Sequence, residues 1–234
     1  GYRELADTIL EHNPGVDLGR VRAAFELADR AHSGQKRKAG TPYVTHCVAA
    51  AQICAEMGLD EDSIVAALLH DCIEDTAITH EDIARQFGAE VADIVEGVTK
   101  LTRVQFTSRE DEQMENLRKM LMAMAKDIRV ILIKIADRLH NMRTMEYMVA
   151  QKQLEKSLET MEIYAPIAHR LGLQKVKWEL EDLSLKYLDP DGYREIITYL
   201  DSKADVLNKF ISDVEKKITD RLTEYNIHAT VQSR

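Results

Sequence analysis

The sequence is poor in glycine, proline, cysteine and aromatic residues. Its 234 residues include only 10 glycines, 4 prolines and 3 cysteines, and aromatic residues make up 6%. Few residues therefore break helices, and the long periodic runs of Ala, Leu, Ile, Met, Glu and Lys indicate a soluble, mostly α-helical protein. No internal repeat or low-complexity tract is present, so a repeat array is not expected. The length suits one large domain or two smaller ones.

The three cysteines, Cys47, Cys54 and Cys72, lie in apolar segments and form no close metal-finger pair. Their odd number and their surroundings indicate free, buried thiols in a reducing cytoplasm rather than a disulfide framework. No apolar run reaches the length of a membrane span, and the N-terminus lacks a signal-peptide pattern. We therefore expect a cytoplasmic protein with no membrane partner. The chain begins with Gly1 rather than Met, which indicates an excised segment.

Positive charge is in deficit, because the formal net charge is −9. This balance argues against direct nucleic-acid binding, and an acidic protein that handles a phosphorylated substrate must gather its cations locally. The strongest cationic run is Lys36-Arg37-Lys38, inside a loop bounded by Gly34 and Gly40. Such runs are usually solvated surfaces, but here an anion-binding loop is a reasonable hypothesis. Lysine stems and a guanidinium could also pack against a flat base.

The segment 63–73 is apolar almost all round, which is the pattern of a buried helix. At its end stand His70 and Asp71, followed by Glu74 and Asp75. In one continuous helix, side chains three or four residues apart point to one flank. Neighbouring buried carboxylates repel each other, so a bound cation would offset this repulsion and stabilise them in the buried position. The alternative is a helix end with solvated acids that form an ordinary ion network.

A second polar stripe lies in the segment 128–148. Its β-branched start could pass for a buried strand, but the apolar spacing that follows favours a helix. Asp137, Asn141 and Thr144 then fall on one stripe of one face, and His140 lies beside them. Asn141 and Thr144 are therefore placed to hydrogen-bond a ribose or a phosphate near Asp137, although each could equally be a cap or a surface residue.

The remaining chain predicts further helices over 2–12, 20–32, 43–57, 79–87, 89–101, 116–125, 154–171, 173–187 and 193–225, the last of them broken once. A polar break is expected over 102–113, and Pro166 should bend its helix or start a new one. The turn residues 189–192 form the clearest boundary, and 227–231 alternates as a strand does. His32 and His80 occupy exposed-looking positions and receive no role.

Four candidate metal ligands come from three predicted helices: His46, His70, Asp71 and Asp137. A lone histidine such as His46 is more often a satisfied core residue than a ligand. Taken together, however, two imidazoles and two carboxylates suit a borderline divalent ion such as Mn²⁺, Fe²⁺ or Zn²⁺. Four protein ligands would leave positions open for water and a phosphate oxygen. This order of residues in a helical chain resembles the HD phosphohydrolase superfamily.

A fuller match is similar to the RelA/SpoT family. It consists of KRKAGTPY at 36–43, HDxxED at 70–75 and ADRLHNMRT at 136–144, and APIAHRLG at 165–172 with WELEDL at 178–183 resembles the central helical linker of that family. The resemblance implies an all-α, HD-type hydrolase domain over residues 1–150 and a helical linker over 151–189. Residues 190–234 would be the truncated start of an α/β synthetase domain.

The resemblance also implies a reaction, which is removal of the 3′-pyrophosphate from the guanine nucleotide alarmones ppGpp and pppGpp to leave GDP or GTP. Mn²⁺ would be held by the four ligands named above, with Glu74 and Asp75 as the catalytic acidic pair, their roles undivided. The substrate-binding candidates are Arg37, Lys38, Tyr43, Asn141, Arg143 and Thr144. Arg234 stands where an ATP-binding basic loop would start, so this segment is not expected to make alarmone. A longer parent would contact the ribosome through C-terminal regions.

Two other functions stay open at this point. One is an HD phosphohydrolase that acts on another nucleotide. The other is a regulatory module that binds alarmone without turnover, which is less favoured because no ligand of the metal motif is missing.

Overall fold

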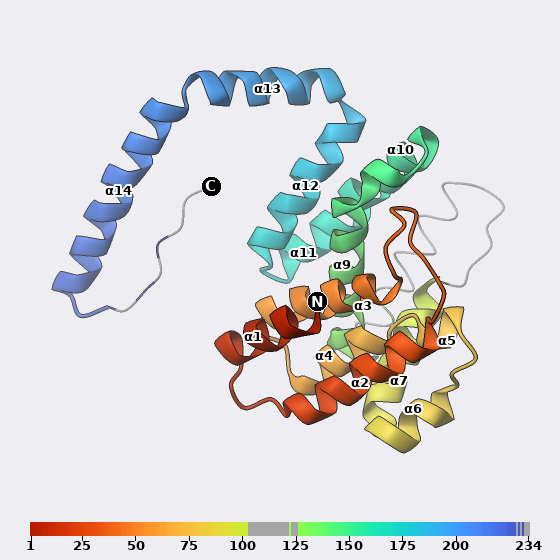
Figure 1. Ribbon diagram of the computed structural model, residues 1–234. Helices are drawn as coiled ribbons and strands as arrows, with labels where there is room; N and C mark the ends of the chain where they lie inside the picture. The colour runs from red at the N-terminus through yellow and green to blue at the C-terminus, as the bar shows by residue number, and fades with distance from the viewer. Residues whose placement is uncertain (103–121, 123–125, 228, 230, 232–234) are drawn as a thin grey trace. The chain divides into compact units, whose positions relative to one another are not determined.

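The computed structural model describes residues 1–102, 122, 126–227, 229 and 231. Every regular secondary-structure element assigned among these residues is a helix (Figure 1). One isolated bridge, between Lys36 and Pro42, closes the cationic loop. The all-α prediction is thus confirmed. The chain divides into two compact units, Gly1–Leu188 and Asp189–Arg234. Among the described residues, no helix has both the length and the apolar composition needed to cross a membrane.

The first unit carries the helices that surround the candidate site. Its first half contains α1 (Tyr2–His12), α2 (Leu18–Ala31), α3 (Val44–Glu56), α4 (Glu61–Leu69), α5 (Cys72–Asp75), α6 (His80–Phe87) and α7 (Ala89–Thr102). Its second half contains α9 (Ile128–Arg143), the 3₁₀ turn η1 (Met145–Tyr147), α10 (Ala150–Glu159), the π turn η2 (Thr160–Tyr164), α11 (Ala165–Arg170) and α12 (Gln174–Leu188). The second unit contains α13 (Pro190–Ser202) and α14 (Ala204–Glu224).

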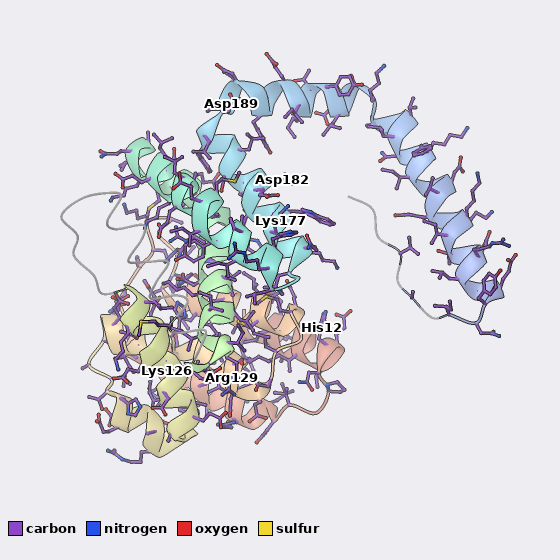
Figure 2. All side chains as sticks on the ribbon, turned by 180° about the vertical axis from the view of Figure 1, so that it is seen from behind. His12, Lys126, Arg129, Lys177, Asp182 and Asp189 are labelled. Atoms are coloured by element: carbon purple, nitrogen blue, oxygen red, sulfur yellow. The ribbon has the colours of Figure 1, made fainter. Side chains whose placement is uncertain are left out.

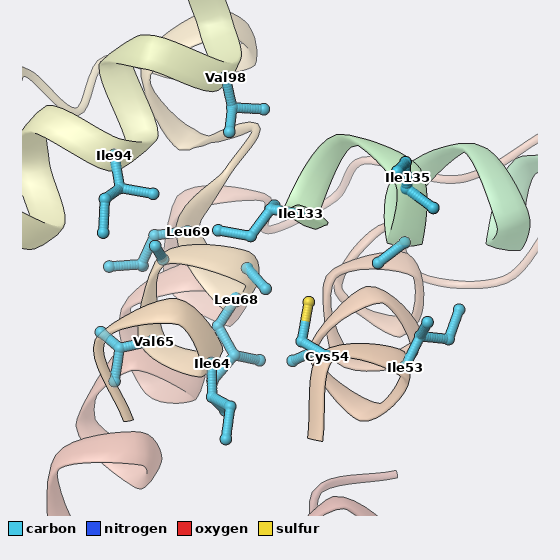
Figure 3. Close-up of a cluster of buried hydrophobic side chains, with 14 of the residues drawn as sticks. Ile53, Cys54, Ile64, Val65, Leu68, Leu69, Ile94, Val98, Ile133 and Ile135 are labelled. Atoms are coloured by element: carbon cyan, nitrogen blue, oxygen red, sulfur yellow. The ribbon is translucent and has the colours of Figure 1, made fainter. Parts of the chain in front are cut away.

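Helix α4 is the centre of the core, because it packs against α2, α3, α7 and α9. Its side chains from Ser63 to Leu69 are all buried, as the apolar pattern predicts. Leu69 of α4 lies near Ile94 of α7 and Ile133 of α9, and Leu68 lies below Ile133 on the side of Cys54 of α3 (Figure 3). Full burial of each such side chain stabilises the fold by about 1.5–3 kcal/mol. This packing fixes the C-terminal end of α4, where His70 follows.

Specific residues fix where the core helices begin. Asp60 caps α4 by accepting the Ser63 backbone N–H at 2.9 Å. Arg129, at the start of α9 and labelled in Figure 2, contacts carboxylates of Asp60 at 3.2 Å, Glu90 at 2.6 Å and Asp127 at 2.6 Å. One guanidinium therefore joins the N-terminal ends of α4, α7 and α9. All three cysteines are free and buried, as predicted.

The predicted continuous helix over 63–73 is wrong. Helix α4 ends at Leu69, and the short helix α5 starts at Cys72. Asp71 has φ −95° and ψ −5°, which interrupts the regular α-helical ladder. His70 turns its Nδ1 onto the Ala67 carbonyl at 2.8 Å. His70 and Glu74 therefore lie on either side of a break rather than in one regular helix.

Other differences from the predicted helices have local causes. Helix α9 ends at Arg143 rather than at 148, and at its end both the backbone N–H and the hydroxyl of Thr144 donate to the His140 carbonyl, at 3.2 and 3.1 Å. Pro166 lies in the first turn of α11, directly after a π turn; proline has no N–H, so the wider turn accommodates it. The long C-terminal helix breaks once, at Lys203, as predicted.

The predicted strand over 227–231 is wrong for its described residues, 227, 229 and 231, which form no strand. A strand requires a neighbour to pair with, and no described segment supplies one. The predicted polar break over 102–113 and the predicted helix over 116–125 lie almost wholly outside the described residues. The first compact unit continues through residue 150, so the division into hydrolase, linker and synthetase segments stays a prediction.

Candidate functional site

Three separate segments bring His46 of α3, His70 after α4 and Asp137 of α9 together. One ligand atom of each lies within 4.8 Å of the others, and the three residues are only 1%, 1% and 6% exposed. The Nε2 atom of His46 is 3.2 Å from Asp137 Oδ1. Asp71 adds its Oδ2, at 3.0 Å from His70 Nε2 and 3.5 Å from His46 Nε2. The structure therefore groups three of the four predicted metal ligands, and the fourth, Asp71, lies beside the two histidines.

His70 shows that this point requires a positive charge. Its Nδ1 donates to the Ala67 carbonyl, which leaves the lone pair on Nε2. That Nε2 atom is buried and lies 3.0 Å from Asp71 Oδ2, but within the described part of the chain no group has the geometry of a hydrogen bond to it. Burial lowers the pKa of His70, but Asp71 and then Asp137 outweigh burial and raise this pKa to about 9. Either a proton or a metal ion satisfies the same demand.

The carboxylates themselves are ionised. Burial alone raises the pKa of Asp71, but the neighbouring His70 holds this pKa well below its usual range. Burial raises the pKa of Asp137, but the Lys134 ammonium, 2.7 Å away, and the two histidines together hold this pKa far below its usual range. Two anionic oxygens and two imidazole nitrogens form a donor set that suits a borderline divalent ion. An unsatisfied Nε2 among ionised carboxylates fits such an ion.

The cationic loop reaches the metal ligands through Asn141. The Asn141 amide donates to Asp137 Oδ1 at 2.5 Å, and its carbonyl oxygen accepts from Arg37 Nη2 at 2.6 Å. Within the loop, the Arg37 N–H donates to the Thr41 carbonyl at 2.9 Å, and Gly40 adopts a φ of +82° that favours glycine. The loop is thus a formed turn that places Arg37 beside the candidate metal centre.

Tyr43 connects the metal ligands to the acidic pair. Its hydroxyl donates to Asp71 Oδ2 at 2.8 Å and lies 3.1 Å from Asp75 Oδ2. Burial and these two carboxylates raise the pKa of Tyr43, so it remains a donor. Its ring stacks on His32, with centroids 4.6 Å apart. The prediction that His32 is exposed is therefore wrong, because this residue is 3% exposed and its ring packs against the Tyr43 ring.

A cavity of about 760 Å³ opens over these residues. On the side of the loop it is lined by Arg37, Lys38, Glu74 and Asp75, along with Asn141 and Thr144. The remaining substrate-binding candidate, Arg143, is absent from this lining and forms a bidentate pair with Glu179 of α12 at 2.6 and 2.8 Å. These roles stay predictions.

A second group of residues that line the cavity was not predicted from the sequence. It consists of Lys134, Arg138, Lys156, Glu159 and Tyr164. Arg138 pairs with Glu159 at 2.9 Å and lies over the Tyr164 ring at 4.2 Å, and Lys156 pairs with the same Glu159 at 2.9 Å. Lys134 could have been noticed as the one charge in the apolar run 130–136. The α10 residues give no such signal, because only tertiary packing brings them to the cavity.

A family profile described as "HD domain" matches residues 24–174. "Bifunctional (p)ppGpp synthase/hydrolase SpoT" of Escherichia coli (strain K12) is 45% identical over 233 residues, which make up 100% of this chain and 33% of that protein. "Bifunctional (p)ppGpp synthase/hydrolase RelA" of Mycobacterium tuberculosis is 48% identical over 221 residues, or 94% of this chain and 30% of that protein.

"Probable GTP pyrophosphokinase" of Mycobacterium leprae is 48% identical over 224 residues, or 96% of this chain and 28% of that protein. The chain thus spans about a third or less of the length of these relatives. A solved structure described as "A metazoan ortholog of SpoT hydrolyzes ppGpp and plays a role in starvation responses" is 34% identical, covers 54% of this chain and 70% of that chain, and has a TM-score of 0.46. The resemblance to RelA and SpoT proteins is confirmed by the curated relatives, and because the profile matches more than half of its residues, the chain belongs to the HD-domain family.

Proposed function

We propose that this chain hydrolyses ppGpp and pppGpp in a metal-dependent reaction that releases the 3′-pyrophosphate and leaves GDP or GTP. The observation that carries the proposal is the unsatisfied His70 Nε2 beside two ionised carboxylates at the floor of a large cavity. The relatives named as hydrolases support the choice of substrate. Other relatives are named as synthases or pyrophosphokinases, which is why the direction of the reaction needs a direct test.

His46, His70, Asp71 and Asp137 would hold the ion, and Mn²⁺ suits their mixed nitrogen and oxygen donors. When bound, such an ion supplies Lewis-acid activation of water and charge neutralisation at a phosphate oxygen. The acidic pair Glu74 and Asp75 lies at the rim of the same cavity. One of these carboxylates accepts the proton of the attacking water, whose oxygen forms the new bond to phosphorus. The bond between that phosphorus and the ribose 3′ oxygen breaks, so pyrophosphate is released and the 3′ oxygen takes up a proton to become the hydroxyl of GDP or GTP.

Cations from two parts of the chain line the cavity and would bind the phosphate groups. Arg37 and Lys38 approach from the loop, and Lys134 and Lys156 approach from α9 and α10. In a chain with a net charge of −9, this gathering of positive side chains favours a polyanionic substrate. The free, buried thiols support a reducing, cytoplasmic setting for the reaction.

The test is to incubate the chain with ppGpp and Mn²⁺, with and without a chelator, and to separate the products by ion-exchange chromatography. We expect GDP and pyrophosphate, and no turnover with chelator or with the Asp71→Ala variant. Parallel reactions with pppGpp, GTP and ATP test the alternative substrates. Turnover of another nucleotide but not ppGpp would assign the site to a different HD phosphohydrolase. Binding of ppGpp without products would indicate a regulatory module.

A further inference from the structure

We propose that His140 is a positioning residue that fixes the tautomer and the ring orientation of the metal ligand His46. His140 carries no role in the predicted set of site residues, although it lies on α9 three residues after the ligand Asp137. The inference rests on the metal centre of the proposed function, but it is independent of which nucleotide is hydrolysed.

The geometry joins the two rings directly. His46 Nδ1 and His140 Nδ1 are 2.7 Å apart, and the ring centroids are 4.8 Å apart. Two nitrogen atoms at this distance need one proton between them, because two lone pairs or two N–H groups would repel. The other ring nitrogen of His46, Nε2, faces Asp137 Oδ1 at 3.2 Å and Asp71 Oδ2 at 3.5 Å. Nε2 is therefore the atom that faces the candidate ion.

The position of the proton follows from this arrangement. A neutral imidazole that binds a metal through Nε2 carries its proton on Nδ1, and that N–H requires an acceptor. His46 is 1% exposed, so water is not at hand to accept it. The acceptor is the Nδ1 lone pair of His140, which must itself be neutral with its proton on Nε2. Burial and the neighbouring His46 and Arg37 lower the pKa of His140, in keeping with a neutral ring.

The second imidazole ligand, His70, is oriented in the same manner, through the ring nitrogen that faces away from the candidate ion. His70 donates its Nδ1–H to the Ala67 carbonyl at 2.8 Å. Both histidines therefore present Nε2 to the centre, one oriented by a backbone carbonyl and the other by an imidazole. Because α9 supplies both Asp137 and His140, this one helix positions a carboxylate ligand and orients a ligand on α3.

His140 also lines the cavity, so a direct contact with the nucleotide is the competing explanation. Metal affinity in the absence of nucleotide separates the two. The probe is Mn²⁺ alone, titrated calorimetrically into the 234-residue chain and its variants. Each variant is also melted by circular dichroism. The matched control is His80→Ala, since His80 pairs with Asp93 at 2.8 Å, away from the cavity lining.

We expect His140→Ala to weaken Mn²⁺ binding about 10- to 100-fold, the usual effect of removing a group that orients a metal ligand. His140→Gln should recover much of the affinity, because its amide oxygen can accept the His46 N–H. His140→Leu, which has similar bulk but no acceptor, should behave like His140→Ala. His80→Ala should bind Mn²⁺ as the parent chain does. Where His140→Ala does not fold, the comparison of His140→Gln with His140→Leu decides the question.

Parental Mn²⁺ affinity in folded His140→Ala or His140→Leu would overturn the proposal. Equal losses in His140→Gln and His140→Leu would also overturn it, because they would assign the effect to packing. A parent chain that binds no Mn²⁺ would remove the metal centre itself, and the proposed function with it. Loss of affinity in His140→Ala combined with absence of ppGpp turnover in the parent would support the positioning role and refute only the proposed reaction.

Discussion

Removal of the metal ion should make the stability of this chain fall as pH rises from about 6.5 to about 9. Burial lowers the pKa of His70, but Asp71 and Asp137 outweigh burial and raise it from 6.5 to about 9. In the metal-free protein, folded His70 therefore keeps a proton that the unfolded chain releases in this range. The stabilisation is fully present below pH 6.5, and it is lost as pH rises through the folded pKa of about 9.

The size of the effect follows from the same numbers. One unit of difference between the folded and unfolded pKa corresponds to about 1.4 kcal/mol. The difference between 6.5 and about 9 therefore lowers the unfolding free energy by about 3 kcal/mol across this pH range. His46 and His140 act with the opposite sign and at lower pH, because their pKa values are lowered by burial. Saturating Mn²⁺ takes the place of the His70 proton, so the fall should disappear in its presence.

The assay is urea unfolding followed by circular dichroism, in chelator, at several pH values on either side of this window. The variant His70→Gln lacks this group and should give a much flatter profile, with only a small residual fall near pH 9, because burial raises the pKa of the three thiols above their unfolded value of 9.0. His80→Ala should keep the parental slope, since its ring lies in an exposed pair with Asp93. Equal slopes in the parent and in His70→Gln would refute the reasoning, because the extra proton would then reside elsewhere.

Three further outcomes are expected. Leu68→Ala should lower the unfolding free energy by about 2–5 kcal/mol in urea titrations, because Leu68 is fully buried, whereas exposed Leu10→Ala should change it by less than about 0.5 kcal/mol. Glu74→Gln should keep parental Mn²⁺ affinity and lose most of kcat; equal loss of metal would contradict its role as a proton acceptor. Lys156→Ala should raise KM with little change in kcat, and Lys152→Ala on the same helix, outside the cavity lining, should leave both unchanged.

Local patterns were sufficient to predict most of the helices. Apolar spacing placed α4 in the core, and the Thr79 and Asp82 capping box begins α6 where it was expected. The spacing could not show that the helix stops after Leu69, because the break depends on the turn at Asp71 and on the His70 bond to Ala67. The strand signal at 227–231 failed for the described residues 227, 229 and 231, because alternation needs a partner strand, which is a tertiary condition.

The residues of the candidate site that belong to a sequence motif were predictable. The residues that only tertiary packing brings to the cavity were not. His46, His70 and Asp137 are far apart in the sequence but follow a recognisable order, so their convergence was expected. Lys156 on α10 reaches the cavity only because η2 and α12 hold that helix in place. His32 looked exposed because the polar loop follows it, yet the loop folds back and Tyr43 covers its ring.

The hydrogen bond between Arg37 and Asn141 has a consequence for any ligand that enters. At 2.6 Å, the guanidinium already has a neutral oxygen acceptor, and the same Asn141 side chain donates to Asp137. A phosphate that recruits Arg37 must displace that oxygen, so the gain in affinity is the difference between a bond to an anion and a bond to an amide. The Arg37 side chain is thereby held in a defined orientation before a ligand binds. A weakly charged molecule gains little affinity by replacing Asn141 as its partner.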